Sequence, residues 1–174
     1  MQVRLRSAVS LIADRGSMRT FFAACFALMF LCSCSHQHAN LPVEQVTIVM
    51  ANGATHGFTV EIAADAASRA HGLMERTDLP ADAGMLFDYH TPQPVAFWMK
   101  NTPLPLDMLF IRADGTIVSV VANATPYSEK PIPSVEPVQA VLELNGGRAA
   151  ELGIQPGDHV QSAIFSSQNA KPHP

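Results

Sequence analysis

The sequence predicts a mostly β domain, a sandwich or a barrel, with one or two short helices. Three observations support this fold class. Short apolar or alternating runs, bounded by Gly, Pro, Asn and Asp, recur through the middle of the chain. Two of these runs are joined through Asp114-Gly115, a dipeptide that favours a hairpin turn. Only residues 65–74, which are rich in alanine, and residues 148–152 have the character of helices.

Eight strands follow from these runs. They are predicted at residues 43–50, 58–62, 84–89, 95–99, 106–112, 116–121, 139–144 and 159–165. Asn52-Gly53 predicts a turn between the first two strands. Asp65 is the expected N-cap of the first helix, and Gly153 ends the second. Residues 124–137 hold four prolines and are predicted to form an ordered loop over one end of the domain.

The start of the chain is predicted to be a secretory signal at residues 1–33, outside the domain. Several arginines precede an apolar run of eleven residues, 21–31, that contains no charge. Because a permanent transmembrane helix needs about 20 apolar residues, this run is too short to span a bilayer. It fits the hydrophobic core of an export signal, and either Met1 or Met18 is compatible with its start.

The end of this signal resembles a bacterial lipobox. Leu31-Cys32-Ser33-Cys34 has Leu three residues before the last cysteine and a small residue directly before it. The resemblance implies that Cys34 is acylated and that residues 34–42 tether the domain to a membrane. The residue after Cys34 is Ser35 and not an aspartate, which resembles the sorting signal of lipoproteins that are transported to the outer membrane. We therefore expect a lipid-anchored protein that faces the periplasm, with a soluble periplasmic protein as the alternative.

Composition excludes several kinds of function for the exported part. All three cysteines (Cys25, Cys32 and Cys34) lie in the signal region, so the domain has no disulfide, thiol nucleophile or cysteine metal site. Residues 34–174 hold seven Lys and Arg against fourteen Asp and Glu, without a basic block. Nucleic acid binding needs a cationic footprint and is not expected. The histidines have no metal-ligand spacing, and we predict neither a metal nor a cofactor.

Several motifs together resemble one known family. They are residues 69–76 (Arg-Ala-His-Gly-Leu-Met-Glu-Arg), 84–87 (Gly-Met-Leu-Phe), 97–102 (Phe-Trp-Met-Lys-Asn-Thr), 105–107 (Pro-Leu-Asp), 141–147 (Val-Leu-Glu-Leu-Asn-Gly-Gly) and 157–158 (Gly-Asp). In this order and spacing they resemble the family named domain of unknown function 192, over about residues 46–160. The resemblance implies a compact, mostly β domain of jelly-roll or sandwich type, commonly exported. It assigns no catalytic residue.

Candidate ligand-binding residues lie in these motifs. They are Arg69, Trp98, Lys100, Asn101, Asp107 and Glu143. Alternation along a strand at 95–99 places Trp98 and Lys100 on the same side, where a tryptophan beside a cation could hold a ligand such as a sugar ring. Asp107 is expected near the edge of the core, with Arg69, Lys100 or the Asn101 amide as its partner. The amides of 145–147 could hold an anion, although a plain turn is the simpler interpretation.

Three functions remain compatible with the sequence. The first is a non-catalytic envelope module at residues 43–165, followed by a polar tail at 166–174, that binds a small molecule, a glycan or a protein. The second is a hydrolase of envelope polysaccharide, in which Asp107 and Glu143 form a carboxylate pair. The third is a structural or assembly protein.

Overall fold

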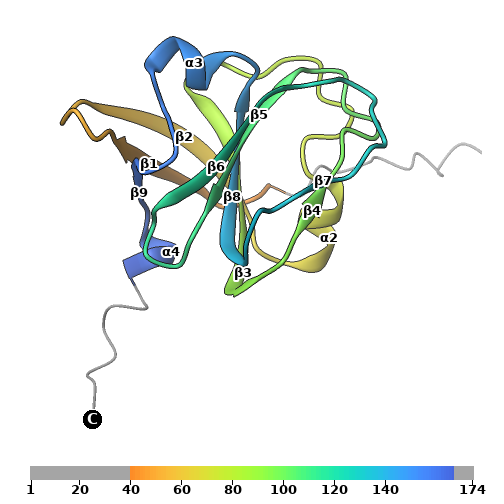
Figure 1. Ribbon diagram of the computed structural model, residues 1–174. Helices are drawn as coiled ribbons and strands as arrows, with labels where there is room; N and C mark the ends of the chain where they lie inside the picture. The colour runs from red at the N-terminus through yellow and green to blue at the C-terminus, as the bar shows by residue number, and fades with distance from the viewer. Residues whose placement is uncertain (1–39, 167–174) are drawn as a thin grey trace, which may run out of the picture. The chain divides into compact units, whose positions relative to one another are not determined.

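The computed structural model describes residues 40–166. The predicted signal, Cys34, most of the predicted tether and nearly all of the predicted tail lie outside this range. Within it the chain forms a mostly β domain with three short helices, as the sequence predicts (Figure 1). Among these residues no helix combines the length and apolar character that crossing a membrane would require.

Seven strands form one sheet in the order β6-β5-β8-β3-β2-β1-β9. These strands are β1 (Val43–Val49), β2 (Thr55–Ala63), β3 (Ala83–Gln93), β5 (Leu106–Ile111), β6 (Ile117–Ala124), β8 (Val138–Asn145) and β9 (His159–Gln161). All neighbours are antiparallel except β2 and β3, which are parallel. A second sheet consists of β4 (Ala96–Phe97) and β7 (Ile132–Pro133). The helices are α2 (Ala66–His71), α3 (Arg148–Leu152) and α4 (Ala163–Ser166).

The large sheet curls so far that its two edges touch at one end. Thr116 forms an isolated bridge with His159, and the Val160 amide donates to the carbonyl of Gly115 at 2.8 Å. Gly115 has a φ of +89°, and a Cβ at this position would lie 2.6 Å from the carbonyl oxygen of Val160. Glycine is therefore required where the edges meet. The result is a partly closed barrel, in agreement with the sandwich or barrel predicted from the sequence.

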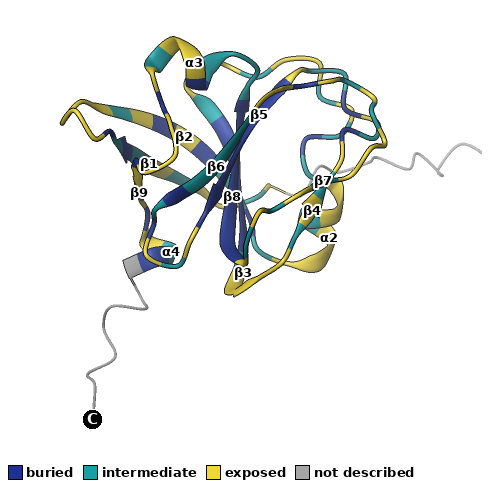
Figure 2. Cartoon of the chain, in the orientation of Figure 1, coloured by how far each residue is buried: buried dark blue, intermediate teal, exposed yellow. Residues whose placement is uncertain are grey.

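The two faces of the curled sheet carry separate hydrophobic cores. The inner core joins β1, β2 and β9 to alternate residues of β5 and β8, and α3 and α4 contribute to it. The outer core lies on the other face of β3, β8 and β5, beneath the segments that carry β4 and β7 and the turn after α2. Figure 1 shows β4, β7 and α2 together on one side of the sheet. Figure 2 shows that the central strands β5 and β8 are largely buried, in agreement with a hydrophobic core on each of their faces.

Most local predictions are confirmed. Asp65 caps α2, where its carboxylate accepts from the amides of Ala67 and Ser68 at 2.9 and 3.0 Å. The hairpin between β5 and β6 turns at the predicted dipeptide, and α3 has the predicted bounds. Gly153 follows α3 in the left-handed conformation.

Two predicted strands are longer than the observed ones by more than one residue. The predicted strand 95–99 has only Ala96–Phe97 in a ladder, and the predicted strand 159–165 ends at Gln161, after which α4 begins. Ser162 Oγ and the Ala163 amide both donate to the Glu44 carboxylate, at 2.8 and 2.7 Å. This contact with a residue of β1 turns the chain out of the sheet. A local sequence pattern cannot predict it, because the two partners lie far apart in the sequence.

Candidate functional site

Residues from four of the sequence motifs meet around one small cavity, here named the Trp98 pocket. It lies on the outer face of the sheet, between α2, the turn after α2, the segment after β4, and the strands β3 and β8. Its lining residues are Arg69, Ala70, His71, Gly72, Leu73, Met74, Phe87, Phe97, Trp98, Thr102 and Glu143. The cavity volume is about 40 Å³, roughly three times the space that one water molecule needs.

Glu143 is the buried acidic group of this pocket. It lies in β8 opposite Met85 of β3 and Met108 of β5, so apolar side chains flank it on both sides. The residue is only 4% exposed. Among residues 40–166 no hydrogen bond or ion pair joins its carboxyl group to another side chain or to the backbone. Burial therefore raises the pKa of Glu143 to about 8, and the group is a neutral acid at neutral pH.

Trp98 forms the exposed part of the pocket. It is 47% exposed, although it is one of the largest apolar side chains of the domain. Lys100 Nζ lies 5.1 Å from the centroid of the Trp98 ring, in a cation–π contact. This confirms that the two side chains lie on the same side of the segment. The Met99 amide between them donates to the carbonyl of Ser128 at 2.8 Å and so holds the segment in place.

Arg69 supplies a fixed positive charge to the wall of the pocket. Its guanidinium Nη1 donates to the carbonyl oxygens of Ala64 and Asp88, and its Cζ lies 5.0 Å from the centroid of the Tyr89 ring. Burial raises the pKa of Tyr89, while the charge of Arg69 acts against this rise. Arg69 is therefore held by carbonyl groups and an aromatic ring, and no carboxylate within the described residues neutralises it.

Asp107 lies elsewhere and has a structural role. It is fully buried on the inner face of the sheet. Its carboxylate accepts from the backbone amides of Asn123, Gly147 and Ala149, at 2.8, 2.9 and 2.8 Å. The prediction that Arg69, Lys100 or Asn101 would be its partner is wrong. The anion held by the turn before α3 is thus a side chain of the protein itself, which fastens α3 to β5 and β6.

The alternative hypothesis of a catalytic carboxylate pair is also wrong. Asp107 lies opposite Leu144 in the ladder between β5 and β8, whereas Glu143 lies opposite Met108. Because neighbouring residues of a strand point to opposite faces, the carboxyl groups of Asp107 and Glu143 lie on opposite faces of the sheet. They cannot attack one glycosidic bond from its two sides, as that chemistry requires.

Of the other candidate residues, Asn101 does not line the pocket. It has a φ of +53° and its carbonyl accepts from the Glu75 amide at 2.8 Å, so it shapes the turn after Lys100. His71, Phe97 and Thr102 line the pocket, and sequence reasoning alone does not identify them as site residues. Their place in the motif segments is the one signal that the sequence contains for them. Within the described range no group of three or more His, Cys, Asp and Glu side chains could hold a metal ion.

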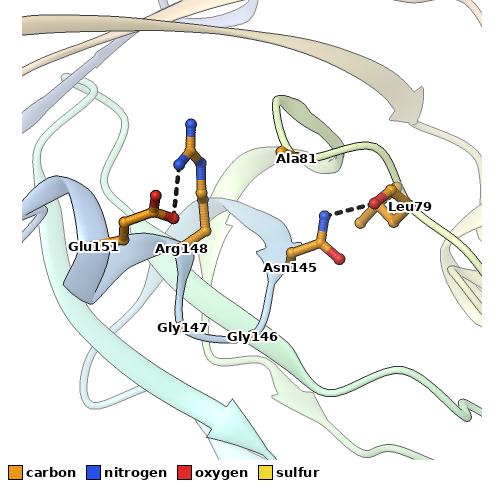
Figure 3. Close-up of a pocket in the computed structure, with 7 residues that line it drawn as sticks. All are labelled: Leu79, Ala81, Asn145, Gly146, Gly147, Arg148 and Glu151. Atoms are coloured by element: carbon orange, nitrogen blue, oxygen red, sulfur yellow. Dashed lines mark hydrogen bonds and ion pairs between the residues drawn. The ribbon is translucent and has the colours of Figure 1, made fainter.

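A larger and more open hollow lies beside α3, here named the Arg148 hollow. It has a volume of about 400 Å³ and is lined by Leu79, Ala81, Asn145, Gly146, Gly147, Arg148 and Glu151. Figure 3 shows two of the contacts in this hollow, one between Arg148 and Glu151 and one between Asn145 and Leu79. Arg148 pairs with Glu151 at 2.7 Å and with Asp82 at 2.6 Å, and Asn145 Nδ2 donates to the Leu79 carbonyl at 2.8 Å. These contacts fasten the segment before β3 to α3, so we regard the Trp98 pocket as the better candidate site.

Comparison with known proteins agrees with this description. The chain matches the model of the family DUF192, described as "Uncharacterized ACR", over residues 47–162. No curated protein sequence matches it.

Two solved structures are similar to the chain. A "putative transcription regulator" from Sinorhizobium meliloti 1021 is 50% identical, with a TM-score of 0.71 over 72% of this chain and 97% of the other. A protein of unknown function from Novosphingobium aromaticivorans DSM 12444 is 44% identical, with a TM-score of 0.69 over 73% of this chain and 90% of the other. The motifs, the fold and these matches agree, and the chain belongs to the DUF192 family.

Proposed function

We propose that this protein is a non-catalytic binding module of the cell envelope that holds a small glycan at the Trp98 pocket. The observation that carries the proposal is the convergence of dispersed motif residues on one cavity with an exposed tryptophan at its mouth. An aromatic ring face beside buried polar groups suits a sugar ring, whose C–H groups stack on the aromatic face and whose hydroxyls need hydrogen bonds.

Glu143 supports the same proposal. A buried polar group is costly unless it has a hydrogen-bond partner, and such a group facing a cavity indicates that a partner comes from outside. Glu143 is buried, faces the pocket and has no such partner among the described residues. A hydroxyl or carboxyl group of a bound sugar would supply one.

One similar protein, from Sinorhizobium, is described as a "putative transcription regulator", but the charge of this domain does not favour DNA binding. Residues 40–166 contain six Lys and Arg against fourteen Asp and Glu. Three of the six cations, Arg76, Arg112 and Arg148, are already paired with carboxylates. The remaining charge is too small for the cationic footprint that a nucleic acid interface needs.

We place the module on the periplasmic side of a membrane, the outer membrane being favoured, with lipid on Cys34 as its anchor. The lipobox-like residues Leu31 and Ser33 before Cys34 support this location. Two or more acyl chains would hold the protein firmly, because each buried methylene contributes about 0.8 kcal/mol.

Tryptophan fluorescence tests the binding function directly, since Trp98 is the only tryptophan of the chain. Full-length protein in mild detergent is titrated with soluble fragments of envelope polysaccharide and with simple sugars. We expect a saturable change in Trp98 emission, and calorimetry should show at least about tenfold weaker binding in Trp98→Ala. Tyr127→Ala is the matched control, since Tyr127 is 65% exposed and does not line the pocket. The proposal fails if no fragment changes the emission, or if Trp98→Ala binds as well as the wild type.

A further inference from the structure

We propose that the Trp98 pocket selects ligands that carry a carboxylate, such as an acidic sugar, with Glu143 donating a hydrogen bond to the carboxylate and Lys100 contributing its positive charge. This inference rests on the proposed binding function and names the chemical class of the ligand.

Cations without a carboxylate partner lie close to the pocket. Residues 40–166 have a large excess of acidic groups, yet three of their six cations form no ion pair with a carboxylate within that range: Arg69, Lys100 and Lys130. Of these three, only Arg69 lines the Trp98 pocket, and Lys100 lies beside it through its contact with Trp98. The pocket is thus a locally positive place on an acidic domain, which favours an anion.

The protonation state of Glu143 inside the pocket also favours an anion. With a pKa of about 8 its carboxyl group carries a proton at neutral pH, and a protonated carboxyl is a hydrogen-bond donor. A neutral acid does not repel an anion, and a hydrogen bond to a charged acceptor is about twice as strong as one between neutral groups. An ammonium ligand would match an ionised Glu143 instead, but Arg69 and Lys100 would oppose it.

The size of the cavity fits a carboxylate group. The cavity of about 40 Å³ has room for roughly three water-sized groups, which is the size of one carboxylate group and not of a whole sugar ring. The ring of the ligand would therefore stay outside, against Trp98, and only its carboxylate would enter. Trp98 is half exposed at the mouth and Glu143 is buried, in agreement with this division of the ligand.

The ionisable groups that surround Glu143 determine how binding depends on pH. Arg69 and His71 on α2 line the pocket with it, and Tyr89 on β3 interacts with it electrostatically. Lys100 lies farther out, against Trp98, and β5 contributes only the apolar Met108. The pKa of Tyr89 is raised by burial, which keeps it neutral. As the pH rises through about 8, Glu143 loses its proton, and the ionised group repels a bound carboxylate. Affinity should then fall by up to about tenfold per pH unit.

Three sugars of one ring type test the inference: galacturonate, galactose and galactosamine, titrated against the Trp98 emission of the full chain in mild detergent. At about pH 6.5 we expect galacturonate to bind about ten- to a hundredfold more tightly than galactose, with galactosamine weakest. Lys100→Met should remove much of this preference. Lys130→Met loses the same charge away from the pocket lining and should keep it.

The pH series identifies the group responsible. In the wild type the affinity for galacturonate should fall between about pH 7 and pH 9. Glu143→Gln, which keeps a donor at the same place, should bind at about pH 7 within a few fold of the wild type and lose the dependence. His71→Asn should retain it. If envelope fragments change Trp98 emission but none of the three sugars does, the carboxylate inference is overturned; if neither the fragments nor the sugars change it, the proposed function itself fails. If galactose or galactosamine binds as well as galacturonate, or if Glu143→Gln keeps the pH dependence, only the carboxylate inference is overturned.

Discussion

Replacing Glu143 by Gln should stabilise the protein, and the gain should grow with pH. Glu143 is 4% exposed and lacks a cationic partner within residues 40–166. Burial raises its pKa from 4.5 to about 8. Above pH 4.5 the unfolded chain has lost this proton while the folded protein still holds it, so folding must take up a proton. Stability due to this group is therefore complete at low pH and falls as the pH rises from 4.5 to about 8.

The magnitude follows from the size of the pKa change. Each pH unit in this window costs about 1.4 kcal/mol of unfolding free energy. At pH 7 the wild type has therefore lost on the order of 3 kcal/mol, and above pH 8 on the order of 5 kcal/mol, through this one group. Gln has nearly the same shape and cannot ionise. The difference in unfolding free energy between Glu143→Gln and the wild type should be small at about pH 4.5 and reach several kcal/mol at about pH 8.

Urea unfolding, followed by Trp98 fluorescence at several pH values, measures this difference. The lowered pKa values of exposed acids such as Asp82 and Glu136 affect both proteins equally and cancel in the comparison. Glu61→Gln is the control, because Glu61 is paired with both terminal nitrogens of Arg76 at 2.6 and 2.5 Å. It should gain no stability at any pH. The reasoning is refuted if the gain in Glu143→Gln is the same at low and high pH, or if the wild type is most stable near pH 8.

Four further outcomes are expected. Asp107→Asn should lower the unfolding free energy by about 2–4 kcal/mol in urea unfolding, because one oxygen of a threefold acceptor becomes an NH₂ group that faces buried amides; an unchanged midpoint would contradict the structural role. Gly84→Ala should destabilise the protein by at least about 1–3 kcal/mol, since its Cβ would lie 2.5 Å from the Glu143 carbonyl oxygen. Trp98→Ala, at a half-exposed position, should change the melting temperature little, whereas a large loss would make Trp98 a core residue. Cys34→Ala should move the protein from the membrane to the soluble fraction, and retention in membranes would disprove the lipid anchor.

Elements with local signals could be predicted from the sequence. The hairpin of β5 and β6, the cap at Asp65 and the end of α3 at Gly153 each depend on a few adjacent residues. The short β4 and the end of β9 could not be predicted in this way. Glu44, which ends β9 by accepting from Ser162 and Ala163, lies 118 and 119 residues away in the chain.

In the candidate site, too, features that depend on neighbouring residues could be predicted, and features that depend on distant residues could not. That Trp98 and Lys100 lie on one side follows from the spacing along a single segment, and their cation–π contact confirms it. Whether Asp107 and Glu143 lie on the same face depends on the register between β5 and β8, which are far apart in the sequence and pair only in the folded protein. Each is an acidic residue in a predicted strand, and the sequence alone is compatible with a shared cleft. A register in which Glu143 faces Met108 instead of Asp107 places one carboxyl group on the inner face and the other on the outer face.

This difference of one residue in register explains why two buried acids have opposite consequences. On the inner face, Asp107 meets the amides of a glycine turn and a short helix, which take up its charge and make it part of the framework. On the outer face, Glu143 meets methionine and phenylalanine side chains and a small cavity, where nothing in the described chain takes up its charge. A buried acid that lowers stability at neutral pH is explained most simply by a function that uses it. The carboxyl group that the fold leaves without a partner therefore supports the ligand site that we propose, and the one that the fold satisfies does not.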